Sequence, residues 1–178
     1  MGGGMTEATK IHRLVSELTG VRLTRVNNVS RRLRESGMLP AGGPGRAPEF
    51  DRADAIVLAV ATASGALLEN VASATRAALA TTPGGADVSG GPLTIPRNAE
   101  IQLAVLASMS LDGDNLEGLT IEVVHGWPEL ALIWADGNVQ RFQTAGSLTN
   151  HQPSSQARIA TRIPGSAFAQ FIREAVNG

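Results

Sequence analysis

The side chains best suited to molecular recognition lie in residues 24–37, TRVNNVSRRLRESG. At 100° per residue, Val26, Val29 and Leu33 fall on one side of a helix. The opposite face carries polar groups: Thr24, Asn27, Asn28, Arg31 and Glu35, flanked by Arg25, Arg32 and Arg34. An Asn amide pairs with adenine, an Arg guanidinium pairs with guanine, and further Arg side chains bind phosphate. The pattern predicts a helix that reads duplex DNA, against the alternative of a solvated Arg-rich face.

Two neighbouring segments are expected to position this helix. Residues 6–18 form a first helix capped by Thr6, with apolar Ile11, Leu14, Val15 and Leu18 at helical spacing. Gly20 ends it, residues 21–23 form a tight turn, and Thr24 is the expected N-cap of the next helix. Asp51 caps a third helix over residues 52–64 that closes the core. The order helix, turn, polar-faced helix predicts a helix-turn-helix arrangement.

A glycine- and proline-rich stretch, residues 41–48, follows the DNA-reading helix. Met38 and Leu39 are expected to pack beneath that helix. The stretch then forms a wing, a short loop or hairpin, in which glycines permit close approach to a phosphate backbone and Arg46 supplies the charge. The alternative is an ordinary surface loop.

This order of parts resembles the MerR-like and excisionase-type winged-helix family over residues 10–60. The resemblance is carried by TGV at 19–21 (the turn), RLRESGMLP at 32–40 (the end of the recognition helix and the strand opening the wing) and GRAPEFD at 45–51 (the return into the closing helix). It implies duplex DNA binding, with Arg31 facing DNA and Arg46 as the wing cation. The chain lacks the family's wing aromatics, long dimerisation helix and effector-binding cysteines, so metal sensing and promoter untwisting do not carry over. A winged-helix head before a small C-terminal unit also resembles uncharacterised phage and prophage proteins.

The charge distribution supports a polyanion-binding head. Residues 1–52 hold nine basic and five acidic residues, a balance of +4, whereas the rest of the chain carries −5. The expected DNA-binding residues are Arg22, Thr24, Arg25, Asn27, Asn28, Arg31, Arg32, Arg34 and Arg46.

The second half of the chain predicts a small α+β unit. Helices are expected at 66–81, at 98–109 with Asn98 as N-cap, and at 164–176. Period-two alternation predicts strands at 119–123, 130–135, 139–144 and 157–163, with Asp136-Gly137 turning a hairpin and a polar loop over 144–155. Residues 82–92 are predicted to form a linker. It separates a DNA-binding domain (6–81) from a dimerisation or partner domain (93–178). The fold class is therefore α+β: a winged helix-turn-helix, further helices, and a small antiparallel sheet with a C-terminal helix.

No local sequence motif indicates catalytic activity. The chain has no Cys, and His12, His125 and His151 are isolated in sequence. Residues 112–117 fail the calcium-loop pattern, and the glycines of 82–92 lack the ending of a phosphate-binding loop. We expect no enzyme activity, no cofactor and no metal site, and we expect Trp127 and Trp134 to be core residues.

The sequence thus predicts a cytoplasmic, sequence-specific and dimeric transcriptional regulator that binds double-stranded DNA, with no membrane span. One alternative is a phage DNA-packaging or excisionase-type assembly factor using the same head. Another is a small-ligand or enzymatic C-terminal domain that the head targets to DNA.

Overall fold

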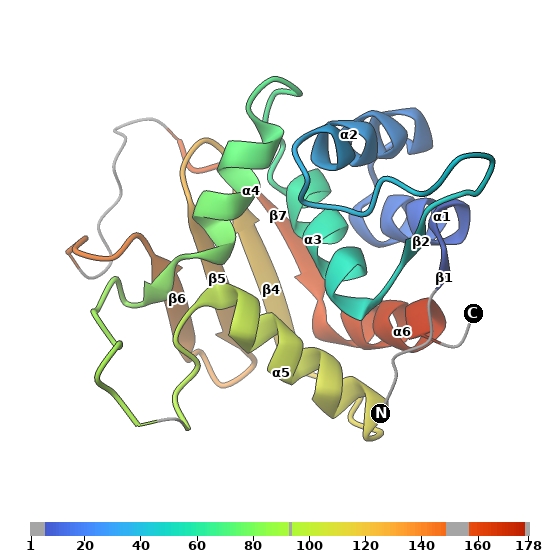
Figure 1. The fold of residues 1–178 in the computed structure, drawn as a ribbon. Coiled ribbons are helices and arrows are strands. Elements are labelled where there is room, and N and C mark those ends of the chain that lie inside the picture. The colour runs from blue at the N-terminus through green and yellow to red at the C-terminus, as the bar shows by residue number, and fades with distance from the viewer. Residues whose placement is uncertain (1–5, 93, 149–156, 177–178) are drawn as a thin grey trace.

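The computed structural model describes residues 6–92, 94–148 and 157–176. Helices pack against one face of a five-stranded antiparallel sheet, as Figure 1 shows. The helices are α1 (Ala8–Thr19), α2 (Leu23–Glu35), α3 (Arg52–Ala63), α4 (Val71–Leu79), α5 (Ala99–Leu111) and α6 (Gly165–Val176). The strands are β1 (Thr6–Glu7), β2 (Glu49–Phe50), β3 (Thr82–Pro83), β4 (Leu119–Val124), β5 (Glu129–Trp134), β6 (Val139–Gln143) and β7 (Ala160–Pro164). The α+β class expected from the sequence is confirmed.

The sheet has the strand order β3-β6-β5-β4-β7, and every neighbouring pair is antiparallel. Ile121 lies opposite Leu132 on one side and Ile163 on the other. All three are buried in the core beneath the helices. Because side chains alternate across a strand, Glu122 and its neighbours in register point to the opposite face.

Several local predictions are confirmed. Asp51 caps α3 in a capping box with Asp54, and the Asn98 side chain accepts from the backbone N–H of Ile101 at the start of α5. The hairpin at Asp136-Gly137 joins β5 to β6, with Ile133 opposite Val139.

Both predicted threonine caps are wrong. Thr6 lies in β1 opposite Phe50, and its hydroxyl donates to the carbonyl of Ala175 in α6 at 2.6 Å. Thr24 lies inside α2, whose N-cap is Arg22 and has no side-chain cap. The helix starts earlier because the N–H groups of Arg25 and Val26 already bond to the Arg22 carbonyl.

Three further boundaries differ from prediction. The helix expected at 66–81 is shorter, because α4 begins only at Val71, after a bend at Gly65 with a positive φ of 64°. Thr82 and Pro83, expected in a linker, form the edge strand β3 against β6. The strand expected at 157–163 begins at Ala160. Most of the loop expected at 144–155, including His151, lies outside the described residues.

The hydrophobic core is continuous between the segments 6–81 and 93–178. Their buried side chains belong to one cluster, and α1 and α3 both pack against α6. The boundary expected at 82–92 therefore does not divide the core, and the division into two domains stays a prediction.

The Asp51 cap gives a prediction about stability. We expect Asp51→Ala to lower the free energy of unfolding by about 1 kcal/mol, because the backbone N–H of Asp54 loses its 2.8 Å acceptor. Thr24→Ala is the matched control, and it should leave stability within about 0.5 kcal/mol because Thr24 caps nothing. Urea unfolding of both variants measures the difference. Equal losses in the two variants would contradict the assignment.

Candidate nucleic-acid interface

The apolar stripe predicted for α2 is confirmed. Val26, Val29 and Leu33 are at most 1% exposed and pack into the shared core. α2 contacts α1, α3 and α4 with this side. Thr24, Asn27, Asn28 and Arg31, on the other side, are all exposed. The helix therefore presents amide and guanidinium groups to solvent on a support that cannot rotate without opening the core.

Three of the predicted arginines hold weak, exposed ion pairs. Arg31 lies 3.8 Å and Arg32 2.9 Å from Glu35, and Arg46 lies 3.1 Å from Glu49. Exposed pairs of this kind contribute about 0–1 kcal/mol. Phosphate can therefore replace the carboxylates at small cost.

Arg22, Arg25 and Arg34 differ in their surroundings. Arg22 is exposed at the start of α2, where there is no side-chain cap and no acidic residue in the first turn. A helix start of this kind is favourable for phosphate. Arg25 is half-buried and its guanidinium donates to the carbonyl of Ala66, so it ties α2 to the chain after α3. Arg34 is half-buried, and its Nε has no hydrogen-bond partner among the described residues.

His12 is a residue of α1 whose side chain contacts α2. Its Nε2 is 2.8 Å from Ser30 Oγ, and its ring packs at 5.9 Å from Phe50. Burial lowers the pKa of His12, a hydrogen bond with the Asn27 side chain opposes this shift, and the charge of Arg34 adds to it. The ring therefore favours its neutral form, and it connects the core side of α2 to one of the exposed amides.

The strand expected to open the wing is absent. Gly37 adopts a φ of 74°, and the N–H groups of Met38 and Leu39 turn back to the Leu33 carbonyl. Leu39 is buried beneath α2, as predicted. The expected return into the closing helix runs through β2, which pairs with β1, and within the loop 41–48 the structure has a bridge between Gly43 and Arg46.

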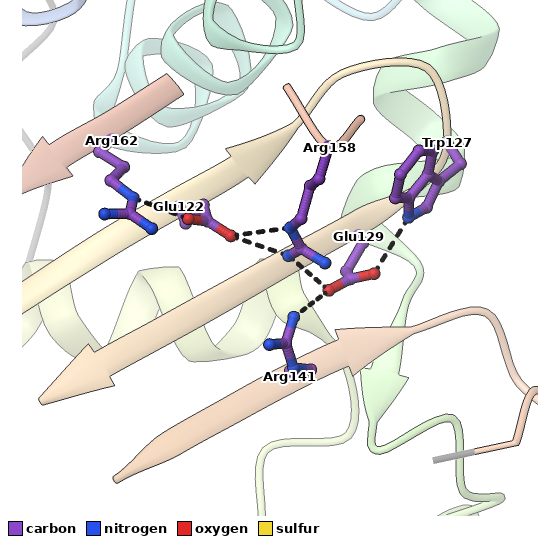
Figure 2. A network of polar contacts seen from close by, with 6 residues as sticks. All are labelled: Glu122, Trp127, Glu129, Arg141, Arg158 and Arg162. Atoms are coloured by element: carbon purple, nitrogen blue, oxygen red, sulfur yellow. Dashed lines mark hydrogen bonds and ion pairs between the residues drawn. The ribbon is translucent and has the colours of Figure 1, made fainter. Parts of the chain in front are cut away.

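A second polar cluster, on the sheet face turned away from the helices, was not predicted from the sequence (Figure 2). Glu129 on β5 is 1% exposed. It accepts hydrogen bonds from Arg158 at 2.7 Å, Arg141 at 2.9 Å and the indole of Trp127 at 3.0 Å. Trp127 is thus a hydrogen-bond donor to this cluster as well as a partly buried ring.

Glu122 on β4 is the second carboxylate of this cluster. It is 4% exposed and accepts from Arg158 at 2.8 and 3.1 Å and from Arg162 at 2.8 Å. Arg158 therefore bridges two buried carboxylates on neighbouring strands. The sequence signal was a glutamate in or beside each of two largely apolar predicted strands: Glu122 lies within 119–123, and Glu129 comes just before 130–135.

All the carboxylate oxygens of this cluster are already hydrogen-bonded. Burial alone raises the pKa of Glu122, but hydrogen bonds and charge from Arg162 and Arg158 outweigh it and lower the pKa overall. Burial also raises the pKa of Glu129, and Trp127, Arg158 and Arg141 outweigh it in the same way. Both groups are held as carboxylates, which suits a structural role and not that of a general acid.

These shifts predict a loss of stability in acid. Because the folded pKa of each glutamate lies below its unfolded value, the unfolded chain binds protons more readily. The stabilisation is complete above about pH 4.3, the ordinary pKa of glutamate, and is lost as the pH falls below it. Urea unfolding from pH 7 to pH 3 should show this decline. The double variant Glu122→Gln and Glu129→Gln should flatten the decline, and an unchanged slope would contradict the assignment.

Among residues 6–92, 94–148 and 157–176, no three His, Asp or Glu side chains gather closely enough to hold a metal ion. No helix in the same residues is long and apolar enough to cross a bilayer.

Comparison of the chain with protein-family models, curated proteins and solved structures gives no match.

Proposed function

We propose that the protein binds double-stranded DNA through the outer face of α2 and acts as a sequence-specific transcriptional regulator. The observation that carries this proposal is the two-sided character of α2. Its apolar stripe is at most 1% exposed, while Asn27, Asn28 and Arg31 project into solvent. A rigid helix carrying amides and guanidiniums matches the dimensions and hydrogen-bonding groups of the major groove.

The surroundings of α2 supply the phosphate contacts. Arg22 at the uncapped helix start and Arg32 near its end place positive charge at both ends of the exposed face. Arg46 extends from the adjacent loop, with its side chain 75% exposed. Phosphate contacts of this kind fix the register of a protein on DNA, and the central side chains then read the bases. In this proposal α1, α2 and α3 act as a helix-turn-helix unit with a loop in place of a strand-built wing.

A dimer is part of the proposal. One helix contacts only a few base pairs, and two half-sites are the usual way to reach high specificity. Selection of bound sequences from a random duplex pool tests the function directly. A palindromic consensus supports a dimeric regulator, whereas no enrichment over the starting pool overturns sequence-specific binding.

Salt dependence and the loop cation give a separate prediction. Binding should weaken steeply with salt, and Arg46→Ala should weaken binding to all duplexes alike and reduce the salt slope by about 1, because one phosphate contact is lost. Fluorescence anisotropy with the selected duplex and a scrambled one measures both effects. A loss confined to the selected duplex would place Arg46 on a base edge and contradict this role.

A further inference from the structure

A cleft of about 480 Å³ lies where α4 meets the turn between β4 and β5. Its walls come from residues 64–78 and 124–128, two stretches that are far apart in the chain. The volume is within the range of about 300–1,000 Å³ typical of small-molecule sites. This cleft is separate from the exposed face of α2.

The lining defines the chemistry of an occupant. None of the twelve lining residues carries a charge, and the walls are mainly small apolar groups such as Ala66, Ala74 and Ala77, together with Trp127. Asn70 lies at the exposed rim, and its side-chain amide has no hydrogen-bond partner among the described residues. A site of this kind favours an uncharged, largely apolar molecule with one polar group for the rim amide, because a charge there would have no partner.

The walls of the cleft are held by specific contacts. Gly65 lies so close to the His125 ring that a Cβ at this position would come within 2.8 Å of Nδ1. His125 Nε2 is 2.9 Å from Thr161 Oγ1, and that hydroxyl donates to the carbonyl of Ala63 at 2.8 Å. Trp127, which also lines the cleft, is held by its indole N–H, which donates to buried Glu129 (Figure 2). The shape is therefore built into the fold before any ligand binds.

One wall of the cleft also contacts α2. The carbonyl of Ala66, a lining residue, accepts from the guanidinium of Arg25. An occupant that displaces the chain at Ala66 changes the position of Arg25, which flanks the exposed face of the helix. We propose that the cleft binds an uncharged, largely apolar small molecule that regulates DNA binding through the Ala66–Arg25 contact. The regulatory part rests on the proposed function, and the binding part does not.

Two dyes that share one skeleton test the binding part on the full chain. N-phenylnaphthylamine is uncharged and fluoresces in apolar surroundings, and anilinonaphthalenesulfonate differs from it by an anionic sulfonate. We expect saturable binding of the uncharged dye and at least about tenfold weaker binding of the sulfonate. Equal affinities, or no saturable binding of the uncharged dye, would overturn the inference.

Variants locate the dye. Ala74→Phe fills the cleft and should weaken binding of the uncharged dye at least about tenfold, because the ring occupies its volume. Ala77→Phe, at a more exposed lining position, repeats the test should the first variant not fold. Ala53→Phe, on the exposed side of α3 and outside the cleft, is the matched control and should leave affinity unchanged. Native-like dye binding in folded Ala74→Phe and Ala77→Phe proteins would place the dye elsewhere and overturn the site.

Titration in the presence of saturating selected duplex tests the regulation. Coupling between two binding sites is reciprocal, so each ligand changes the affinity of the protein for the other by the same factor. If the cleft regulates DNA binding, saturating duplex should change the affinity for the uncharged dye by at least about fivefold. An unchanged dye affinity in a protein that binds both would overturn the regulatory part alone. Dye binding by a protein that binds no duplex would overturn the proposed function and leave the site standing.

Discussion

Replacing Arg158 with Met is expected to lower the free energy of unfolding by about 3 kcal/mol, because it leaves two buried carboxylates short of a partner. Arg158 donates to Glu122 and Glu129, which are 4% and 1% exposed. Each glutamate keeps another guanidinium, so the loss falls at the lower end of the range for broken buried ion pairs. For a chain of this length the midpoint of thermal unfolding should fall by about 6–12 °C.

Arg46→Met is the matched control for this substitution. Its pair with Glu49 is exposed on both sides, so its removal should change stability by less than about 1 kcal/mol. Circular dichroism melting of the two variants measures both losses. A small change in Arg158→Met would show that water replaces the guanidinium and that the cluster contributes little to stability.

Replacing Arg31 with Ala is expected to abolish most of the preference for one base pair in the selected duplex. A bidentate contact between Arg and guanine is worth about 1–3 kcal/mol, or about 5- to 150-fold in affinity. Arg31 is suited to this contact because it is exposed on the central part of α2 and, among the described residues, its ion pair is the 3.8 Å one with Glu35. Anisotropy titrations with the selected duplex and single-base variants measure the loss of discrimination.

Arg97→Ala removes the same charge from an exposed position just before α5, outside the proposed interface. It should leave both affinity and base preference unchanged at moderate salt, where distant charges are screened. Unaltered discrimination in the Arg31→Ala protein would remove that side chain from base reading. A uniform loss on all duplexes would reassign it to phosphate.

Local sequence determined the features whose partners lie within a few residues. The stripe of Val26, Val29 and Leu33 follows from helical periodicity alone. The Asp51 cap and the Asp136-Gly137 hairpin depend on hydrogen bonds that span three or four residues. These interactions are decided by short stretches of chain, so a sequence pattern is sufficient to predict them.

The two threonine caps show where local patterns become ambiguous. Thr6 and Thr24 are both residues of a type favoured at the N-cap. Thr6 instead pairs with Phe50 in a strand and donates to the Ala175 carbonyl. Thr24 lies inside α2, because this helix starts earlier than predicted. The prediction of a strand that opens the wing was wrong for a similar reason. The chain after Gly37 turns back to the Leu33 carbonyl, and the returning segment forms β2, which pairs with β1.

The sequence by itself determined that α2 has an apolar side and an Asn/Arg side, because side-chain direction in a helix follows from position in the chain. Only the tertiary structure decided which residues meet across long separations. Arg158 lies 36 residues from Glu122 and 29 from Glu129, and Ala66 lies 41 from Arg25. Contacts of that kind depend on how the whole chain packs, because the residue pattern of one helix or strand does not predict which distant segment will lie against it.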